Sequence, residues 1–424
     1  MPIKTTPFLA TCPHCFSRIN LLHGVFRCVG GYCNCKQPDC TCGSQACVAR
    51  KDVSVETSKG QERFRKGEEI PKREDARLRQ VWDDANPKNH TFAASGLVPP
   101  VPFLGAVRKR AKCPFGGHVT TDRLCPNCHK SLYSKFGEVA ERRLTVIGAS
   151  GAGKSNYISV VVREMQDRFS GQFGFSFWPM HMDMGTEYEE NYRRPVFDLG
   201  QVVKVTPNVT TRRNAVAPMV FTVQRISDGE HLSTISFFDP PGEGVVNERN
   251  IERFHHFVFN SQGLVLLVDG EKLLDPKGQD AAFNEATTVL QNASRQLEAQ
   301  RGWMRRLRPY LAITISKADL LASRPDVPAE LATQPRHDRG FDENDFRVLS
   351  SEIETLIRKR GGGNFCNVAQ SAFGPDRVGF FAVSALGASP DPRTLKLTKL
   401  DPLRVADPLL WLMIRTGVLK QAGA

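Results

Sequence analysis

The chain has 424 residues, enough for two or three domains of ordinary size, which excludes a single small cross-linked scaffold. Hydrophobic residues make up 40% of it and charged residues 24%, and these shares argue against a disordered or membrane-embedded chain. Lysine and arginine outnumber acidic residues by 57 to 45, and the resulting formal charge of +12 favours an anionic partner of unspecified kind.

The first residues do not resemble a secretory signal. They carry one lysine and only a brief apolar patch before Cys12. The longest apolar runs, which begin at Gly263 and Pro408, are far shorter than the roughly 20 residues that cross a bilayer. We therefore expect a cytoplasmic protein with no transmembrane segment.

Eleven of the twelve cysteines precede residue 129, and only Cys366 follows it. Because the cytosol keeps thiols reduced, closely spaced cysteines there favour zinc over disulfides. The spacing predicts two zinc ions within the first 50 residues, with the division of ligands left open and with His14 or His23 as alternatives to a cysteine. The first ion is expected at Cys12, Cys15, Cys28 and Cys33, and the second at Cys35, Cys40, Cys42 and Cys47.

A further zinc site is expected before residue 130. Its predicted ligands are Cys113, His118, Cys125 and Cys128, with His129 as an alternative fourth ligand. Closed four-coordinate sites of this kind stabilise small modules and leave no position open for catalysis. The predicted organisation is a zinc-binding region over 1–50, a linker over 51–105, a zinc ribbon over 106–140 and a nucleotide-binding domain over 141–424.

Residues 144–169 have the order strand, glycine loop, helix. The apolar run 144–147 is followed by GASGAGKS at 148–155 and then by an apolar-periodic stretch from 157 to 169. In this context the loop amides bind phosphate, the lysine reaches the β and γ oxygens, and the serine hydroxyl binds Mg²⁺. The nucleotide-binding residues expected here are Gly148, Ser150, Gly151, Ala152, Gly153, Lys154, Ser155 and Asn156.

An antiparallel hairpin is predicted over 218–238, with its turn at 227–230. It leads into DPPGE at 239–243, where Asp239 is expected to hold Mg²⁺ through water and the Gly242 amide to sense the γ-phosphate. Upstream, Thr211 is the preferred Mg²⁺-binding threonine of the switch I segment, and Thr210 is the alternative.

The motifs downstream of residue 262 predict which nucleotide base the site binds. Buried strands are predicted at 263–269, 310–315 and 378–383. The second runs into SKAD, where the Asp319 carboxylate can accept from N1–H and the exocyclic amine of guanine, a donor pair that adenine lacks, while the stem of Lys317 packs along the ring. The third runs into Ser384, Ala385 and Leu386, whose amides can meet guanine O6. Guanine is therefore favoured over adenine.

GASGAGKS, DPPGE, SKAD and SAL, in that order and each at a strand end, resemble the G1, G3, G4 and G5 motifs of translation-factor and Ras-like GTPases over residues 141–424. With the cysteine-rich region in front, the layout is similar to the bacterial double-GTPase family of paired-GTPase regulatory or conflict systems. The expected architecture is an α/β P-loop domain with a mainly parallel sheet that carries one antiparallel strand, preceded by small zinc-ribbon modules. The resemblance also implies Mg²⁺-dependent hydrolysis through Lys154, Thr211 and Glu243.

Two positions depart from the family pattern. Ser316 stands where Asn or Thr is usual, which implies weaker guanine binding. Glu243 stands at the water-positioning place often held by Gln or His, which implies slow turnover without a partner.

The expected function is a GTP-binding and GTP-hydrolysing switch in a bacterial regulatory or conflict (defence) system. Its expected cofactors are GTP, Mg²⁺ and Zn²⁺, and its expected partner is a protein such as a second GTPase. One alternative is a zinc-ribbon nucleic-acid-binding protein regulated by its GTPase domain. The basic stretch 104–143 supports this alternative. Another is a scaffold that binds GTP but barely hydrolyses it.

Overall fold

The computed structural model divides into two compact units, Met1–Glu141 and Arg142–Ala424. In the first unit it describes residues 9–14, 17–21, 23–27, 53–57, 60–64, 91–95, 110–112, 119–126, 131–132 and 136–137. In the second it describes 142–148, 151–203, 218–237, 261–299 and 308–419, apart from 323, 325–326, 328, 336, 338–339 and 392.

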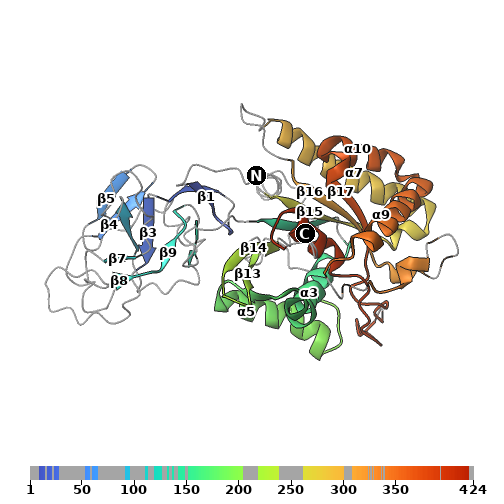
Figure 1. Ribbon diagram of the computed structural model, residues 1–424, viewed down its shortest axis with the longest axis horizontal. Coiled ribbons are helices and arrows are strands. Elements are labelled where there is room, and N and C mark those ends of the chain that lie inside the picture. Colours follow the sequence, from blue (N-terminus) through green and yellow to red (C-terminus); the bar gives the residue numbers. More distant parts are fainter. Residues whose placement is uncertain are drawn as a thin grey trace. The chain divides into compact units, whose positions relative to one another are not determined.

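The first unit contains short antiparallel strands (Figure 1). β1 (Leu9–Thr11) pairs with β2 (Arg18–Asn20), and β4 (Val53–Thr57) with β5 (Gly60–Phe64). β7 (Ala111–Lys112) pairs with β8 (Val119–Thr120). A four-stranded sheet has the order β10 (Ser131–Leu132), β9 (Arg123–Leu124), β3 (His23–Arg27), β6 (Thr91–Ser95). Strands β4 to β6 therefore fall in the segment that the sequence analysis assigned to a linker.

The second unit is built on a parallel sheet, but the antiparallel strand expected in it is not among the described strands of this sheet. Its order is β11 (Leu144–Gly148), β15 (Gly263–Asp269), β16 (Tyr310–Ser316), β17 (Val378–Ala382), with every neighbouring pair parallel. All residues of β11 and β15 are buried, which explains their continuous apolar runs, because a parallel sheet is covered on both faces.

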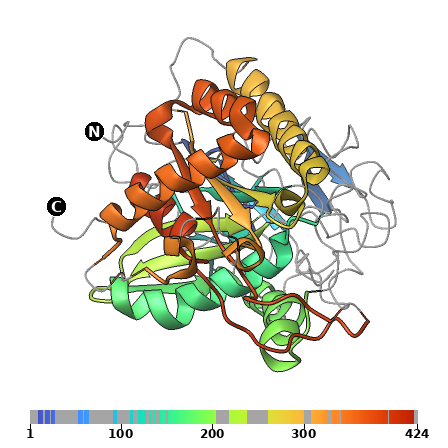
Figure 2. The same cartoon turned by 90° about the vertical axis from the view of Figure 1, so that its right-hand side faces the viewer.

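Helices cover the two faces of this sheet (Figure 2). Alternate strand residues such as Val146, Val265 and Ala312 share a core with α3 (Lys154–Glu164) and α11 (Asp407–Arg415). On the other face, Leu266 and Val268 lie against α7 (Pro276–Ala299). There α7 packs on α10 (Gly363–Phe373), and α9 (Glu343–Ile357) packs on β17.

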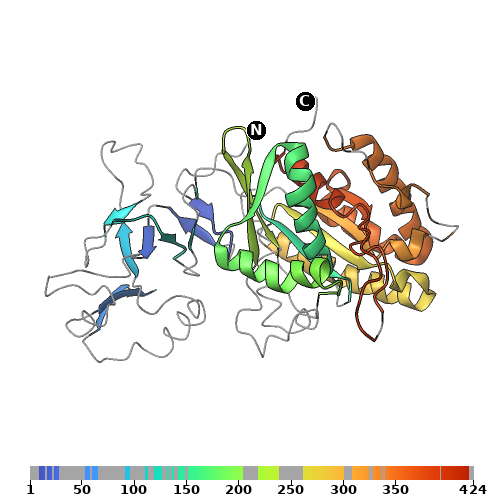
Figure 3. The same cartoon turned by 90° about the horizontal axis from the view of Figure 1, so that it is seen from below.

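The predicted hairpin is present as β13 (Met219–Arg225) and β14 (His231–Phe237). It does not extend the parallel sheet as a ladder but forms a separate antiparallel sheet with β12 (Phe175–Pro179), and β14 contacts β11. Figure 3 shows these strands on the side of α3 and away from α7. Two π-helical segments, Met165–Phe169 and Glu189–Asp198, and α5 (Met182–Tyr188) complete this side.

The remaining short elements are α4 (Ser170–Phe173), α8 (Asp319–Ala322) and the 3-10 turns Lys272–Leu274, Ala329–Ala332 and Pro375–Arg377. Between α9 and α10, the segment Arg358–Gly362 is a kink, with non-helical backbone angles at Arg360 and Gly361. Among the described residues, no helix has both the length and the apolar character that a membrane span requires.

Candidate nucleotide-binding site

The glycine loop joins the carboxyl end of β11 to the first turn of α3. A Cβ on Gly148 would lie 2.8 Å from the Leu267 carbonyl oxygen, so only glycine fits where β11 meets β15. Gly151 and Gly153 both have φ +78°, a left-handed conformation that glycine adopts without a steric cost. Gly153 is the N-cap of α3. The loop therefore presents a helix N-terminus of the kind that binds phosphate.

Lys154 is the first residue of α3 and is only 6% exposed. Its Nζ donates a hydrogen bond to the Gly148 carbonyl oxygen at 3.0 Å, so the ammonium folds back over the loop. A cation held there is suited to balance the charge of an anion bound by the loop amides.

Asn156, in the first turn of α3, contacts the backbone at Val203. Its Oδ1 accepts a hydrogen bond from the Val203 amide at 2.9 Å. Ser155, the expected Mg²⁺ ligand, lies between Lys154 and Asn156 in the same turn. Ala152 is fully buried in the core below the loop.

Asp269 belongs to none of the predicted motifs, and the structure places it beside the loop. Asp269 ends β15 and is buried, and a Cβ on Gly151 would lie 3.7 Å from its Oδ2. The sequence signal for Asp269 was its position as an acidic residue at the end of the apolar run 263–268. Its importance depends on β15 being the neighbour of β11, and strand order is not visible in local sequence.

Lys317 is paired with this carboxylate. Its Nζ lies 3.0 Å from Asp269 Oδ1 and 2.7 Å from Glu271 Oε2. Burial lowers the pKa of Lys317, but the hydrogen bonds and charges of Glu271 and Asp269 outweigh it, so the pKa lies above its usual value. Lys317 therefore stays protonated and links the SKAD motif to the end of β15.

Asp319 and Ser384 are brought together by the pairing of β16 with β17. The Ser384 hydroxyl donates to Asp319 Oδ1 and accepts from the Gly387 amide at 2.9 Å. The Ala318 amide donates to the Val383 carbonyl oxygen at 3.0 Å, which joins the two loops through the backbone. Ala385 and Leu386 follow Ser384 and are half-buried. The Asp319 carboxylate is thus oriented by a neighbouring side chain.

Ser316, the last residue of β16, forms a side-chain hydrogen bond to the neighbouring strand β15. Its hydroxyl donates to the Val268 carbonyl oxygen at 3.2 Å, which fastens the end of β16 to β15.

The other predicted site residues lie outside the described residues. For the nucleotide these are Ser150, Thr211, Asp239, Gly242 and Glu243. For zinc they are Cys15, Cys28, Cys33, Cys35, Cys40, Cys42, Cys47, Cys113, His118 and Cys128, whereas Cys12 and Cys125 are described and buried. Across the described ranges, no three or more His, Cys, Asp or Glu side chains form a group suited to a metal ion.

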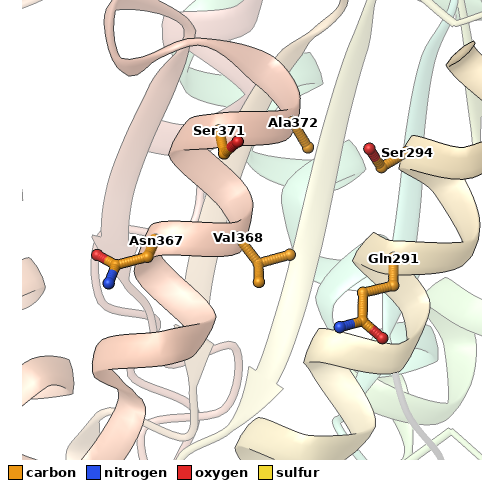
Figure 4. A pocket seen from close by; sticks show the side chains of 6 residues that line it. All are labelled: Gln291, Ser294, Asn367, Val368, Ser371 and Ala372. Carbon is orange, nitrogen blue, oxygen red and sulfur yellow. The ribbon is translucent and has the colours of Figure 1, made fainter.

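A pocket of about 430 Å³ lies elsewhere, between α7 and α10 (Figure 4). Val368 and Ala372 of α10 face Gln291 and Ser294 of α7 across it. None of its lining residues belongs to the predicted motifs.

The glycine loop, the Asp269–Lys317 pair and the Asp319–Ser384 pair all stand at the carboxyl ends of the parallel strands, where α/β proteins bind ligands. This fold and motif order define a P-loop GTPase. A family model described as Double-GTPase 2 matches residues 142–363, which is 222 of the 424 residues, and the chain belongs to this family.

One curated relative is the putative ESX-1 scaffolding and assembly protein SaeC of Mycolicibacterium smegmatis. It is 25% identical over 322 residues, covering 70% of this chain and 80% of the relative.

Similar solved structures include the GTP-bound GTPase-like domain of Ski7 from S. cerevisiae. It has 16% identity and a TM-score of 0.29, covering 65% of this chain and half of the Ski7 chain. Another is the signal recognition particle receptor SRb-GTP/SRX complex of Chaetomium thermophilum, with 16% identity and a TM-score of 0.30, covering 59% of this chain and 94% of that one.

Proposed function

We propose that the chain is a GTP-binding and GTP-hydrolysing switch of a bacterial regulatory or conflict system, acting in the cytoplasm. The observation that carries the proposal is the Asp319 carboxylate, which Ser384 orients at the same sheet edge as the glycine loop. Asp319 accepts from N1–H and the exocyclic amine of guanine, and the amides of Ala385 and Leu386 meet O6. Hydrogen bonds to a charged group contribute about 1.5–3 kcal/mol each.

The phosphates bind at the other end of the site. Amides of Gly151, Gly153 and the first turn of α3 donate to phosphate oxygens, and the Lys154 ammonium leaves the Gly148 carbonyl to meet the β and γ oxygens. The Asp269–Lys317 pair holds the base-binding loop beside the phosphate loop.

The residues present fit a magnesium ion. Ser155 supplies a hydroxyl in the first turn of α3, and by motif Thr211 and Asp239 supply a hydroxyl and a carboxylate. Oxygen ligands of this kind suit Mg²⁺. The ion would neutralise charge on the β and γ oxygens. Glu243 orients the attacking water, and Gly242 responds to loss of the γ-phosphate.

The name of the curated relative indicates the cellular process in which the switch acts, because it refers to scaffolding and assembly. We assign the switch to the control of a protein assembly, with the zinc-binding N-terminal modules contacting a protein partner. This favours a protein partner over the nucleic acid of the rival interpretation.

Single-turnover phosphate release from GTP tests the hydrolytic part. We expect release to require Mg²⁺ and to fall on the order of 100-fold when EDTA removes it, because the ion stabilises the transferring phosphoryl group. Release at the same rate with and without Mg²⁺ would contradict the mechanism. GTP recovered intact after long incubation with Mg²⁺ would favour the binding-only scaffold.

A further inference from the structure

Two hairpins in the first unit carry the same loop. The last pair of the β1–β2 hairpin is Thr11 with Arg18, and the last pair of the β9–β10 hairpin is Leu124 with Ser131. Both therefore enclose six residues, 12–17 and 125–130. Both loops begin with the sequence Cys-Pro-x-Cys. The two cysteine motifs thus occupy equivalent positions in two copies of one supersecondary unit.

The first cysteine of each loop is buried in the same small core. Cys12 and Cys125 are both 0% exposed, and they share one cluster with the side chains Ile19, Leu21, Leu132 and Phe136. The spacing in the sequence predicted that these two cysteines bind different ions. Their common cluster brings the two loops to one place.

His14 joins the loops directly. Its backbone N–H donates a hydrogen bond to the Cys12 sulfur at 3.4 Å. Its ring Nε2 donates to the Ser131 carbonyl oxygen at 3.0 Å, and Ser131 is the first residue after the second loop.

The intervening strands hold this arrangement. β3 follows the first hairpin and pairs with β9, placing Val25 opposite Leu124, the residue before Cys125. The Arg123 guanidinium donates to the Leu21 carbonyl oxygen at 2.7 Å. The approach of the two loops therefore follows from sheet pairing and does not depend on one contact.

We propose that Cys12 and Cys125 ligate one and the same zinc ion. The spacing within each Cys-Pro-x-Cys motif supplies Cys15 and Cys128 as the other two thiolates; both lie outside the described residues and enter through sequence alone. Four thiolates from two such loops make a closed tetrahedral site, which is structural. In this assignment Cys28 and Cys33 share an ion with the later cysteines and not with Cys12. Likewise, Cys113 and His118 do not share an ion with Cys125.

Zinc content of the purified full-length protein tests the shared ion. We expect Cys12→Ser and Cys125→Ser each to lose about one equivalent, and the double variant to lose that same single equivalent. If the cysteines serve separate ions, the double variant loses about two equivalents, which overturns the proposal. Zinc content unchanged in the single variants also overturns it.

Cys366→Ser is the matched control, because Cys366 is a buried cysteine of α10 in the second unit, and its zinc content should equal that of the wild type. A serine variant can lose zinc by unfolding its module, so histidine variants supply a second readout. Cys12→His and Cys125→His keep a ligand at each position, and with Co²⁺ in place of zinc each should lose the same share, about a quarter, of one site's thiolate-to-cobalt absorption.

A double histidine variant should then lose about half of that one site's absorption. Absorption that instead falls at two spectrally separate cobalt sites would contradict a shared ion. The shared zinc site lies in the first unit and uses none of the predicted nucleotide-binding residues. GTP binding measured on the same samples separates its failure from failure of the proposed function.

Discussion

Asp319→Asn is expected to change the preference of the site from guanosine to xanthosine triphosphate. Xanthine keeps N1–H but carries a carbonyl oxygen where guanine has its exocyclic amine. With xanthine, the asparagine carbonyl oxygen can accept from N1–H and the asparagine NH₂ can donate to that oxygen. With guanine, the asparagine NH₂ faces the exocyclic amine, which is also a donor, so no hydrogen bond forms there. Ser384 can orient an amide as it orients the carboxylate, because a hydroxyl both donates and accepts.

The expected loss of GTP affinity is about 100-fold, since a charge-assisted bond is removed and a buried donor is left unpaired, together about 3 kcal/mol. Competition between the two nucleotides in a filter-binding or calorimetric assay measures it. Asp280→Asn is the matched control, because it makes the same chemical change at an exposed position of α7. Unchanged GTP affinity in the Asp319 variant would remove Asp319 from the base site.

Lys154→Ala is expected to reduce single-turnover GTP hydrolysis at least about 1,000-fold. The ammonium lies over the glycine loop, where we propose that the phosphates bind, and preorganised charge contributes more to the transition state than to the ground state. Binding should weaken as well, since a charge-assisted bond to phosphate is lost. Rapid-quench measurement of phosphate separates the two effects.

The control for this variant is Lys359→Ala, which removes an exposed lysine between α9 and α10. It should hydrolyse GTP at the wild-type rate. A Lys154 variant that hydrolyses within tenfold of the wild type would mean that phosphate is bound elsewhere in the chain.

Local features of the fold were readable from the sequence because they follow local rules. Continuous apolar runs marked β15 and β16, a glycine-rich stretch marked the loop before α3, and alternation around an Asp-Gly turn marked the β13–β14 hairpin. Each of these properties is contained within one short stretch of neighbouring residues, the longest being the hairpin Met219–Phe237.

Features that depend on long-range neighbours were not readable. Asp269 and Lys317 are 48 positions apart and meet only because β15 and β16 are adjacent. Asp319 could be chosen for base recognition from its motif, but its contact with Ser384 depends on the pairing of β16 with β17. Phe175 and Phe177 of β12 alternate with Ser176 and Trp178 as in a half-buried strand, but local sequence does not show that β12 pairs with β13 in a separate sheet, so that sheet was missed.

Titration calorimetry of the full chain with GTP and ATP in the presence of Mg²⁺ tests the central claim most directly. Asp319 accepts two donors from guanine and finds no such pair on adenine, so the account predicts that GTP binds at least about 100-fold more tightly. Equal affinities for the two nucleotides would contradict it.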